Sequence, residues 1–161
     1  MRSLVLQHGF GLVEIVVVAG IVSTVFVGMF QLVILATRPI ASSTREAEAT
    51  YLAEEALEAV RALRNENWTD NITPLSNGTT YYPTLISNRW TLSTTNTGPV
   101  QGLYAQTVVL GAAYRDGNDN ISPTGTLDEN TKKVTATVTW TEHGQTKNVT
   151  LETYITNFFA T

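Results

Sequence analysis

The sequence has no cysteine, few histidines and little charge, and each shortage excludes a class of function. Without cysteine there is no disulfide framework, thiolate metal site or thiol nucleophile. The only histidines are His8 and His143, which leaves little material for a histidine metal site or a Ser-His-Asp arrangement. Charged residues make up 15% of the chain, against the usual ~25%, and the formal net charge is −4. An acidic chain argues against general nucleic-acid binding, which requires a basic face.

Charge is almost absent from a long apolar run near the N-terminus. From Phe10 to Ala36 the only ionisable residue is Glu14. Residues 15–36 would form roughly 33 Å of helix, close to the ~30 Å thickness of a bilayer's hydrocarbon core. The sequence therefore predicts a membrane-spanning helix. A carboxylate at mid-bilayer costs about 2.5–3.5 kcal/mol, so Glu14 is interpreted as a functional residue.

The residues before this run form a short leader, 1–9. It contains one cation, Arg2, and is too short to be an ordinary secretory signal with its own apolar region. The leader ends at Gly9, an aromatic residue follows at Phe10, and Glu14 comes four residues later. This G-F-x-x-x-E pattern before an apolar helix resembles the class III signal of type IV prepilins and pseudopilins.

The resemblance implies a specific processing and assembly chemistry. A membrane prepilin peptidase would cleave between Gly9 and Phe10 and methylate the new amine of Phe10. Glu14 would pair with the Phe10 amine of a neighbouring subunit as the filament forms. The implied partners are other pilins, the peptidase, a membrane platform protein and an assembly ATPase. The precursor would lie in the cytoplasmic membrane with its head outside, and the assembled filament at the cell surface.

The sequence departs from the family at one position in the apolar helix. Many members have a proline there, where the helix can melt on assembly, whereas this chain has Gln31 and its first proline is Pro39. The extent of melting in the segment 10–36 is therefore left open.

The next segment, 37–66, is predicted to continue the helix as an amphipathic half. Pro39 would kink a continuous helix, and Ser43 with Glu46 fits a capping box, so a restart there is an alternative. An apolar stripe with helical spacing indicates that one face covers a sheet. The stripe consists of Ala49, Leu52, Ala53, Ala56, Leu57, Ala59, Val60 and Leu63.

The remaining residues, 67–161, are predicted to form a β-sheet head. Apolar and polar residues alternate, as expected for strands with one buried face. Glu142 to Gln145 is a tight connection between the two clearest strands, which predicts a hairpin. We expect an α+β fold with a long N-terminal helix packed on an antiparallel sheet of about four or five strands. The predicted strands are 80–86, 89–94, 103–114, 134–140 and 149–155.

The segment from Arg115 to Lys133 is predicted to be a turn-rich loop. Oxygen side chains at Asp116, Asn118 and Asn120, with Asp128 further along, superficially resemble a calcium loop, and some pseudopilins bind calcium in head loops. The full twelve-residue pattern is absent, and these residue types favour turns in any case. The prediction is therefore a plain loop without a cofactor, with a calcium site as the alternative.

Three functions remain open from the sequence. The first is a structural, non-enzymatic pilus subunit, either major or minor. The second is a minor pilin or a pseudopilin of secretion or DNA uptake, whose head binds a surface, a cargo protein or DNA. The third is a static head anchored by a single membrane pass. The acidic composition argues mildly against DNA, because phosphate contacts require Lys and Arg.

Overall fold

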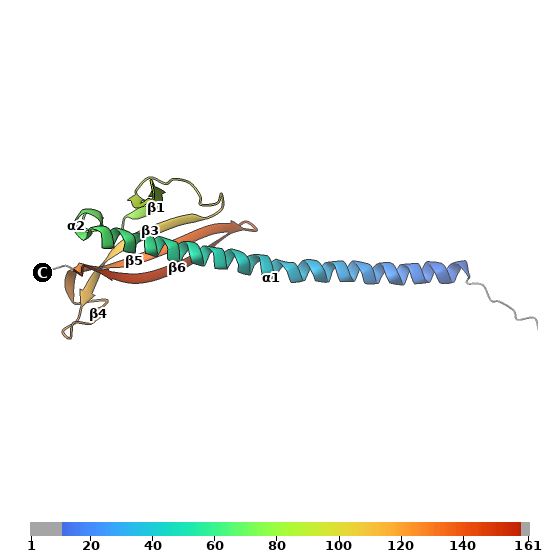
Figure 1. Cartoon of the computed structure of the whole chain (residues 1–161). Helices are drawn as coiled ribbons and strands as arrows, with labels where there is room; N and C mark the ends of the chain where they lie inside the picture. The colour runs from blue at the N-terminus through green and yellow to red at the C-terminus, as the bar shows by residue number, and fades with distance from the viewer. Residues whose placement is uncertain (1–10, 159–161) are drawn as a thin grey trace, which may run out of the picture. The chain divides into compact units, whose positions relative to one another are not determined.

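The computed structural model describes residues 11–158, without the side chains of residues 35–41, and confirms the α+β class. The chain divides into two units, which meet between Thr44 and Arg45. Helix α1, Leu12–Glu66, begins in the first unit and ends in the second (Figure 1). The second unit, called the head below, comprises residues 45–161 and holds every strand.

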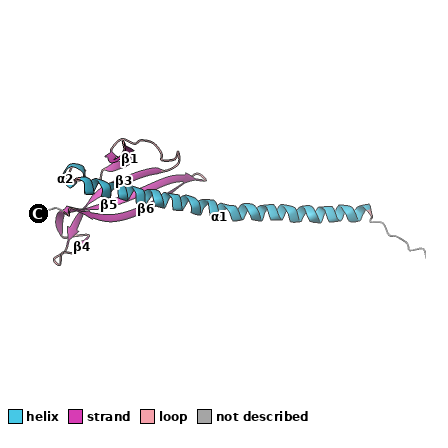
Figure 2. Ribbon diagram, in the orientation of Figure 1, coloured by secondary structure: helices cyan, strands magenta, loops and turns pink. Residues whose placement is uncertain are grey.

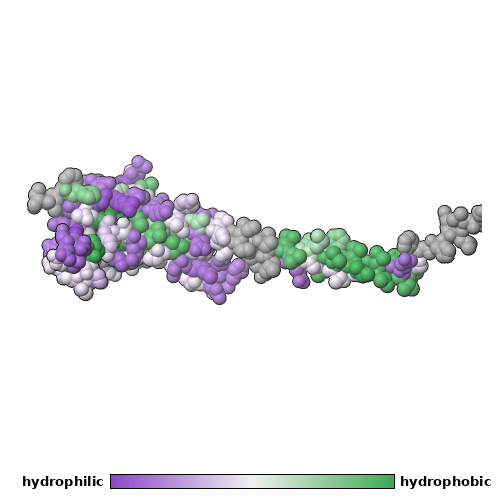
Figure 3. All heavy atoms as spheres, turned by 90° about the horizontal axis from the view of Figure 1, so that it is seen from below, coloured by the Kyte–Doolittle hydropathy of each residue, from purple (hydrophilic) through white to green (hydrophobic). Residues whose placement is uncertain are grey.

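The first unit consists of the N-terminal part of α1. Every residue from 11 to 34 is exposed, and the segment Leu12–Ile34 is long and apolar enough to span a membrane. In a space-filling view this segment is predominantly hydrophobic, whereas the surface of the head is largely hydrophilic (Figure 3). The membrane-length helix predicted from the sequence is therefore present.

The restart of the helix near Ser43 is not observed. The α-helical assignment of α1 includes Pro39, Ser43 and Glu46. A proline within a helix removes one backbone hydrogen bond and crowds the preceding turn, but good helix formers on its C-terminal side favour continuation. Ser43 is therefore an interior residue of the helix rather than its cap.

Besides the second part of α1, the head contains a short helix and an antiparallel sheet whose strands differ in length (Figure 2). Helix α2, Trp68–Asn71, follows α1 and is capped by the side chain of Asn67, which accepts a hydrogen bond from the Asp70 amide. The sheet has the strand order β2-β1-β3-β5-β6, with β4 paired to β3. Its strands are β1 Thr80–Ile86, β2 Arg89–Ser93, β3 Ala105–Arg115, β4 Ile121–Ser122, β5 Thr126–Glu142 and β6 Gln145–Thr156.

The core lies between the second part of α1 and one face of the sheet. All eight residues of the predicted apolar stripe are buried, four of them alanines that allow a close approach of helix to sheet. All of them except Ala59 belong to core clusters with alternate residues of β3 and β5, including Val108, Leu110, Val134 and Val138. The amphipathic pattern thus positions α1 as a helical cover of the sheet.

Two features of the head differ from the sequence prediction. The sheet has six strands rather than four or five, because β4 adds a short pairing with Arg115 and Tyr114 of β3. The segment from Arg115 to Lys133 is not wholly a loop, because β5 already begins at Thr126. Its polar residues join the sheet through pairing with β3, after a register shift at Ala112/Ala113.

The predicted hairpin between β5 and β6 is present. The two strands pair from Thr131 and Thr156 to Glu142 and Gln145 without a register shift. His143 and Gly144 form the turn with φ of 50° and 76°, the left-handed conformation that a two-residue hairpin connection of this type requires. His143 is therefore an exposed turn residue.

Candidate assembly segment and the polar clusters of the head

Glu14 lies in the first turn of α1, and its residue is exposed. Within residues 11–34 it is the sole ionisable side chain. The helix begins with hydrogen bonds from the amides of Glu14 and Ile15 to the carbonyl of Gly11, at 3.0 and 3.3 Å. A carboxylate at this end of a helix interacts favourably with the unpaired amides and the macrodipole. Glu14 thus combines a favourable local setting with an apolar surrounding in which a charge needs a partner.

The two hydroxyl side chains of this segment, on Ser23 and Thr24, are satisfied locally. Ser23 donates its hydroxyl hydrogen to the Ala19 carbonyl at 2.7 Å, and Thr24 donates to the Gly20 carbonyl at 2.9 Å. Such bonds allow hydroxyl groups to lie in lipid or in a helix bundle without an external partner. Glu14 is the one ionisable side chain of residues 11–34, and its charge calls for a group from outside the segment.

Small residues recur along the helix after Glu14. A methyl group added at Gly20 or Gly28 would meet no atom within 4 Å in the structure. Within the described chain, neither glycine is needed to accommodate a neighbouring element. The spacing from Gly20 to Thr24 is the small-xxx-small pattern of close helix approach, a frequent feature of membrane helices. The predicted cleavage and methylation residues Gly9 and Phe10 lie outside the described residues.

A polar cluster joins the first turns of α1 within the head to the end of β5. Arg45 donates to the Glu142 carboxylate at 2.8 Å, and Tyr104 donates its hydroxyl hydrogen to Glu48 at 2.6 Å. Burial, followed by the hydrogen bond to Glu48, raises the pKa of Tyr104 to about 12. The ring of Tyr104 meets Trp140 edge to face, with centroids 6.0 Å apart. The sequence offers no signal for this cluster, because its members are far apart along the chain.

The four residues of the alternative calcium loop are engaged in other interactions. The Asp116 carboxylate accepts hydrogen bonds from the amides of Asn118 and Asn120, at 2.8 and 2.9 Å. The bond from the Asn120 amide, followed by the bond from the Asn118 amide, lowers the pKa of the Asp116 carboxyl. Asp128 instead lies 2.7 Å from the guanidinium of Arg115, and that hydrogen bond lowers the pKa of Asp128.

Arg115 binds residues of both parts of the alternative calcium loop. Its guanidinium contacts Asp128 and also donates to the Asp119 carbonyl at 2.8 Å. A cation at this place would have to displace a fixed positive charge. Among residues 11–158 there is no group of three or more His, Cys, Asp or Glu side chains placed to hold a metal ion. The arrangement fits a turn closed by hydrogen bonds.

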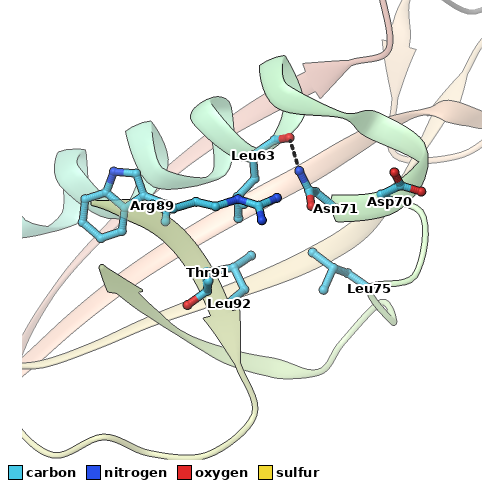
Figure 4. Close-up of a pocket in the computed structure, with 8 residues that line it drawn as sticks. Leu63, Asp70, Asn71, Leu75, Arg89, Thr91 and Leu92 are labelled. Atoms are coloured by element: carbon cyan, nitrogen blue, oxygen red, sulfur yellow. Dashed lines mark hydrogen bonds between the residues drawn. The ribbon is translucent and has the colours of Figure 1, made fainter. Parts of the chain in front are cut away.

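A pocket of about 250 Å³ lies between the end of α1, α2 and β2 (Figure 4). Arg89 reaches across it to form two contacts with Glu66, at 3.0 and 2.8 Å. Asn71 donates to the Leu63 carbonyl at 3.1 Å, which satisfies one of the last carbonyls of α1. The polar groups of this pocket therefore hold the end of α1 to β2. The lining consists of Leu63, Asp70, Asn71, Leu75, Arg89, Trp90, Thr91 and Leu92.

Comparisons with protein-family models, with curated proteins and with solved structures gave no match.

Proposed function

We propose that this chain is a pilin-like structural subunit that polymerises into a filament through its N-terminal helix and has no enzymatic activity of its own. The observation that carries the proposal is Glu14, a single carboxylate in the first turn of an exposed, membrane-length helix. It stands four residues after Phe10, in the sequence pattern that resembles the prepilin signal. The α+β head carried by the same helix is the arrangement that the resemblance implies.

The physical role of Glu14 follows from its surroundings. An unpaired carboxylate in lipid or in a filament core is heavily penalised, and a cationic amine relieves that penalty. Cleavage after Gly9 would create such an amine at Phe10. Pairing of Glu14 with the Phe10 amine of a neighbouring subunit would then fix the register of each incoming helix. The exposed apolar side chains from Leu12 to Ile34 would be buried against the helices of other copies.

The proposal implies an order of events and a set of partners. The precursor is held in the cytoplasmic membrane by the helix of residues 10–36, with the head outside. A prepilin peptidase removes residues 1–9 and methylates Phe10. A membrane platform protein and an assembly ATPase then transfer the subunit from the membrane into the filament. In this proposal the chain itself binds no cofactor and no nucleic acid.

The first experiment determines the mature N-terminus by mass spectrometry of the chain isolated from the cells that make it. We expect a chain that begins at methylated Phe10. A chain that retains Met1 in the assembled state would contradict the processing step.

The second experiment replaces Glu14 by alanine and measures the amount of this chain in the sheared surface fraction. Glu14→Ala should strongly reduce the assembled chain while the membrane precursor accumulates. Gln31→Ala is the matched control, since it removes another polar side chain from the same apolar segment without removing a charge. Equal amounts of filament from Glu14→Ala and wild type would show that Glu14 has no role in assembly.

A further inference from the structure

The two edges of the head sheet present different surfaces. The strand order places β2 at one edge and β6 at the other. Near β6 there is a groove whose lining includes glutamate residues, called the α1/β6 groove below. Near β2 there is an apolar hairpin tip. Because these two surfaces lie at opposite edges of the sheet, they can contact each other only between two copies of the chain. Such a contact uses a different surface of each copy.

The α1/β6 groove has a volume of about 440 Å³ and is lined by residues of both elements. Leu57, which is buried, and Leu151, which is partly buried, provide its apolar lining. Its charged lining residues on α1 are Glu54, Glu58 and Arg61. Glu152 also lines it, but alternation along β6 puts the Glu152 side chain on the opposite face of the sheet from Leu151, where its carboxylate binds Lys133 and Thr135. The groove thus carries an excess of negative charge around an apolar strip.

The carboxylates of the groove differ in their partners. Glu58 pairs with Arg61, and Glu152 lies 2.8 Å from Lys133. Glu54 has no ion pair among the residues that the structure describes. Glu54 is exposed and lines the groove, so it is the groove carboxylate most available to a cation from another molecule.

The hairpin between β1 and β2 has the complementary character. Ser87 and Asn88 form its two-residue turn with φ of 51° and 62°. The two residues before the turn, Leu85 and Ile86, are 54% and 60% exposed although both are large and apolar. Ile86 lies directly opposite Arg89 across the turn. Side chains of directly opposed residues lie on the same face of a sheet, so an apolar group and a cation stand together at this tip.

The charged side chain of this tip is Arg89. Between Asp70 and Arg115 the sequence contains no charged residue other than Arg89. Arg89 binds Glu66 of its own chain, yet its side chain remains 58% exposed. A guanidinium has five donor hydrogens, so the contacts with Glu66 leave donors for a second carboxylate. The hairpin tip thus combines two exposed apolar side chains with a guanidinium that has donors left, and the groove combines an apolar strip with the carboxylate of Glu54.

We propose that the Leu85–Ile86 hairpin tip of one copy docks in the α1/β6 groove of a second copy, with Arg89 facing the carboxylates of the groove. This inference rests on the proposed filament function and names a contact between heads. The contact is heterologous, because each copy offers its tip to one neighbour and its groove to another. A heterologous contact that does not close into a ring produces an open helical assembly. The head thereby contributes to the lateral order of the filament in addition to the apolar helix.

Disulfide trapping tests this contact directly, because the native chain contains no cysteine. The full chain carrying Ile86→Cys and Glu54→Cys is produced in the cells that make it, and sheared filaments are oxidised and separated without reductant. We expect a ladder of dimers, trimers and larger species, since every copy has both partners. The control pair is Ile86→Cys with Thr150→Cys, which lies on β6 beside Leu151 but on the opposite face of the sheet. This control should remain monomeric.

The outcomes separate the contact from the proposed function. Filaments that form but give no ladder, or give the same ladder with the Thr150 control, overturn the docking of the tip in the groove and leave the filament function standing. A wild-type chain that never enters a sheared filament overturns both. Should the double variant fail to assemble, the two single variants are produced together with wild-type chain. A disulfide dimer that requires both then supports the contact, and its absence from assembled filaments overturns it.

Discussion

The guanidinium of Arg45 lies 2.8 Å from the carboxylate of Glu142, a residue 97 positions later in the chain. Arg45 is in the first turn of α1 that belongs to the head, and Glu142 is the last residue of β5. The carboxylate is only 6% exposed, whereas the guanidinium is 40% exposed. This ion pair ties the part of α1 that belongs to the head to the hairpin end of the sheet.

Arg45→Ala should lower the free energy of unfolding of the head by about 1–3 kcal/mol, because a mostly buried carboxylate loses its guanidinium partner. Chemical denaturation of the full chain in mild detergent measures the change. Arg61→Ala is the control, since it removes an exposed pair with Glu58 on the same helix and should cost less than about 1 kcal/mol. Equal losses for both variants would contradict a structural role specific to Arg45.

The contact between α1 and the sheet depends on small side chains. Ala56 is fully buried in the larger core cluster. Ala56→Leu should destabilise the head by about 1–3 kcal/mol, because added methylene groups force the helix and the sheet apart. Ala62→Leu introduces the same side chain at an exposed position of the same helix and should be nearly neutral. Thermal unfolding followed by near-ultraviolet circular dichroism distinguishes the two variants.

Local patterns in the sequence predict much of this fold. The helical spacing of the stripe from Ala49 to Leu63 identifies the buried face of α1, and all its members are buried. Strand β1 has the predicted limits of residues 80–86, because turn residues bound it on both sides. The membrane-length helix follows from composition alone. In each of these cases the determining interactions lie within a few residues of one another.

Features that depend on distant residues could not be predicted in this way. Four of the first five residues of β5, Thr126 to Asn130, are polar, and the segment has the composition of a loop. They form a strand because β3 supplies the pairing and Arg115 binds Asp128 across it. The contacts of Arg45 and Tyr104 join segments separated by more than 50 positions. Such pairings are decided by tertiary packing, which sequence periodicity does not encode.

Acid should weaken the β3–β4–β5 region through Asp128. The hydrogen bond from Arg115 holds the pKa of Asp128 below its ordinary value of 3.8. A carboxyl group with a lowered pKa in the folded state stabilises the fold at pH values above its ordinary pKa. That contribution is lost as the pH falls below 3.8 and through the lowered value. The free energy of unfolding should therefore drop in this range.

The matched variant is Asp128→Asn, measured by denaturation between pH 7 and pH 3. At pH 7 it should be less stable than wild type by about 1–2 kcal/mol, and the difference should shrink on acidification as the wild-type carboxylate becomes protonated. Asp119→Asn removes a carboxylate that lies 3.5 Å from the same guanidinium but is 85% exposed, so its effect should be small. A constant difference between Asp128→Asn and wild type across the pH range would contradict the assignment.

Gly125 should be the least replaceable residue of the turn before β5. Its φ is +142°, and a Cβ atom there would lie 2.1 Å from the Arg115 carbonyl oxygen. Gly125→Ala therefore requires the backbones of β3 and the turn to separate, and the strained conformation alone costs about 1–3 kcal/mol. Gly117→Ala is the matched control in the same region, because an added Cβ there meets nothing within 4 Å. Hydrogen exchange on the full chain should show faster exchange of the β4 amides and the adjoining β3 and β5 amides in Gly125→Ala and wild-type rates in Gly117→Ala. Since the docking groove and hairpin tip proposed above are built from other residues, Gly125→Ala should lose local protection without losing disulfide trapping between heads.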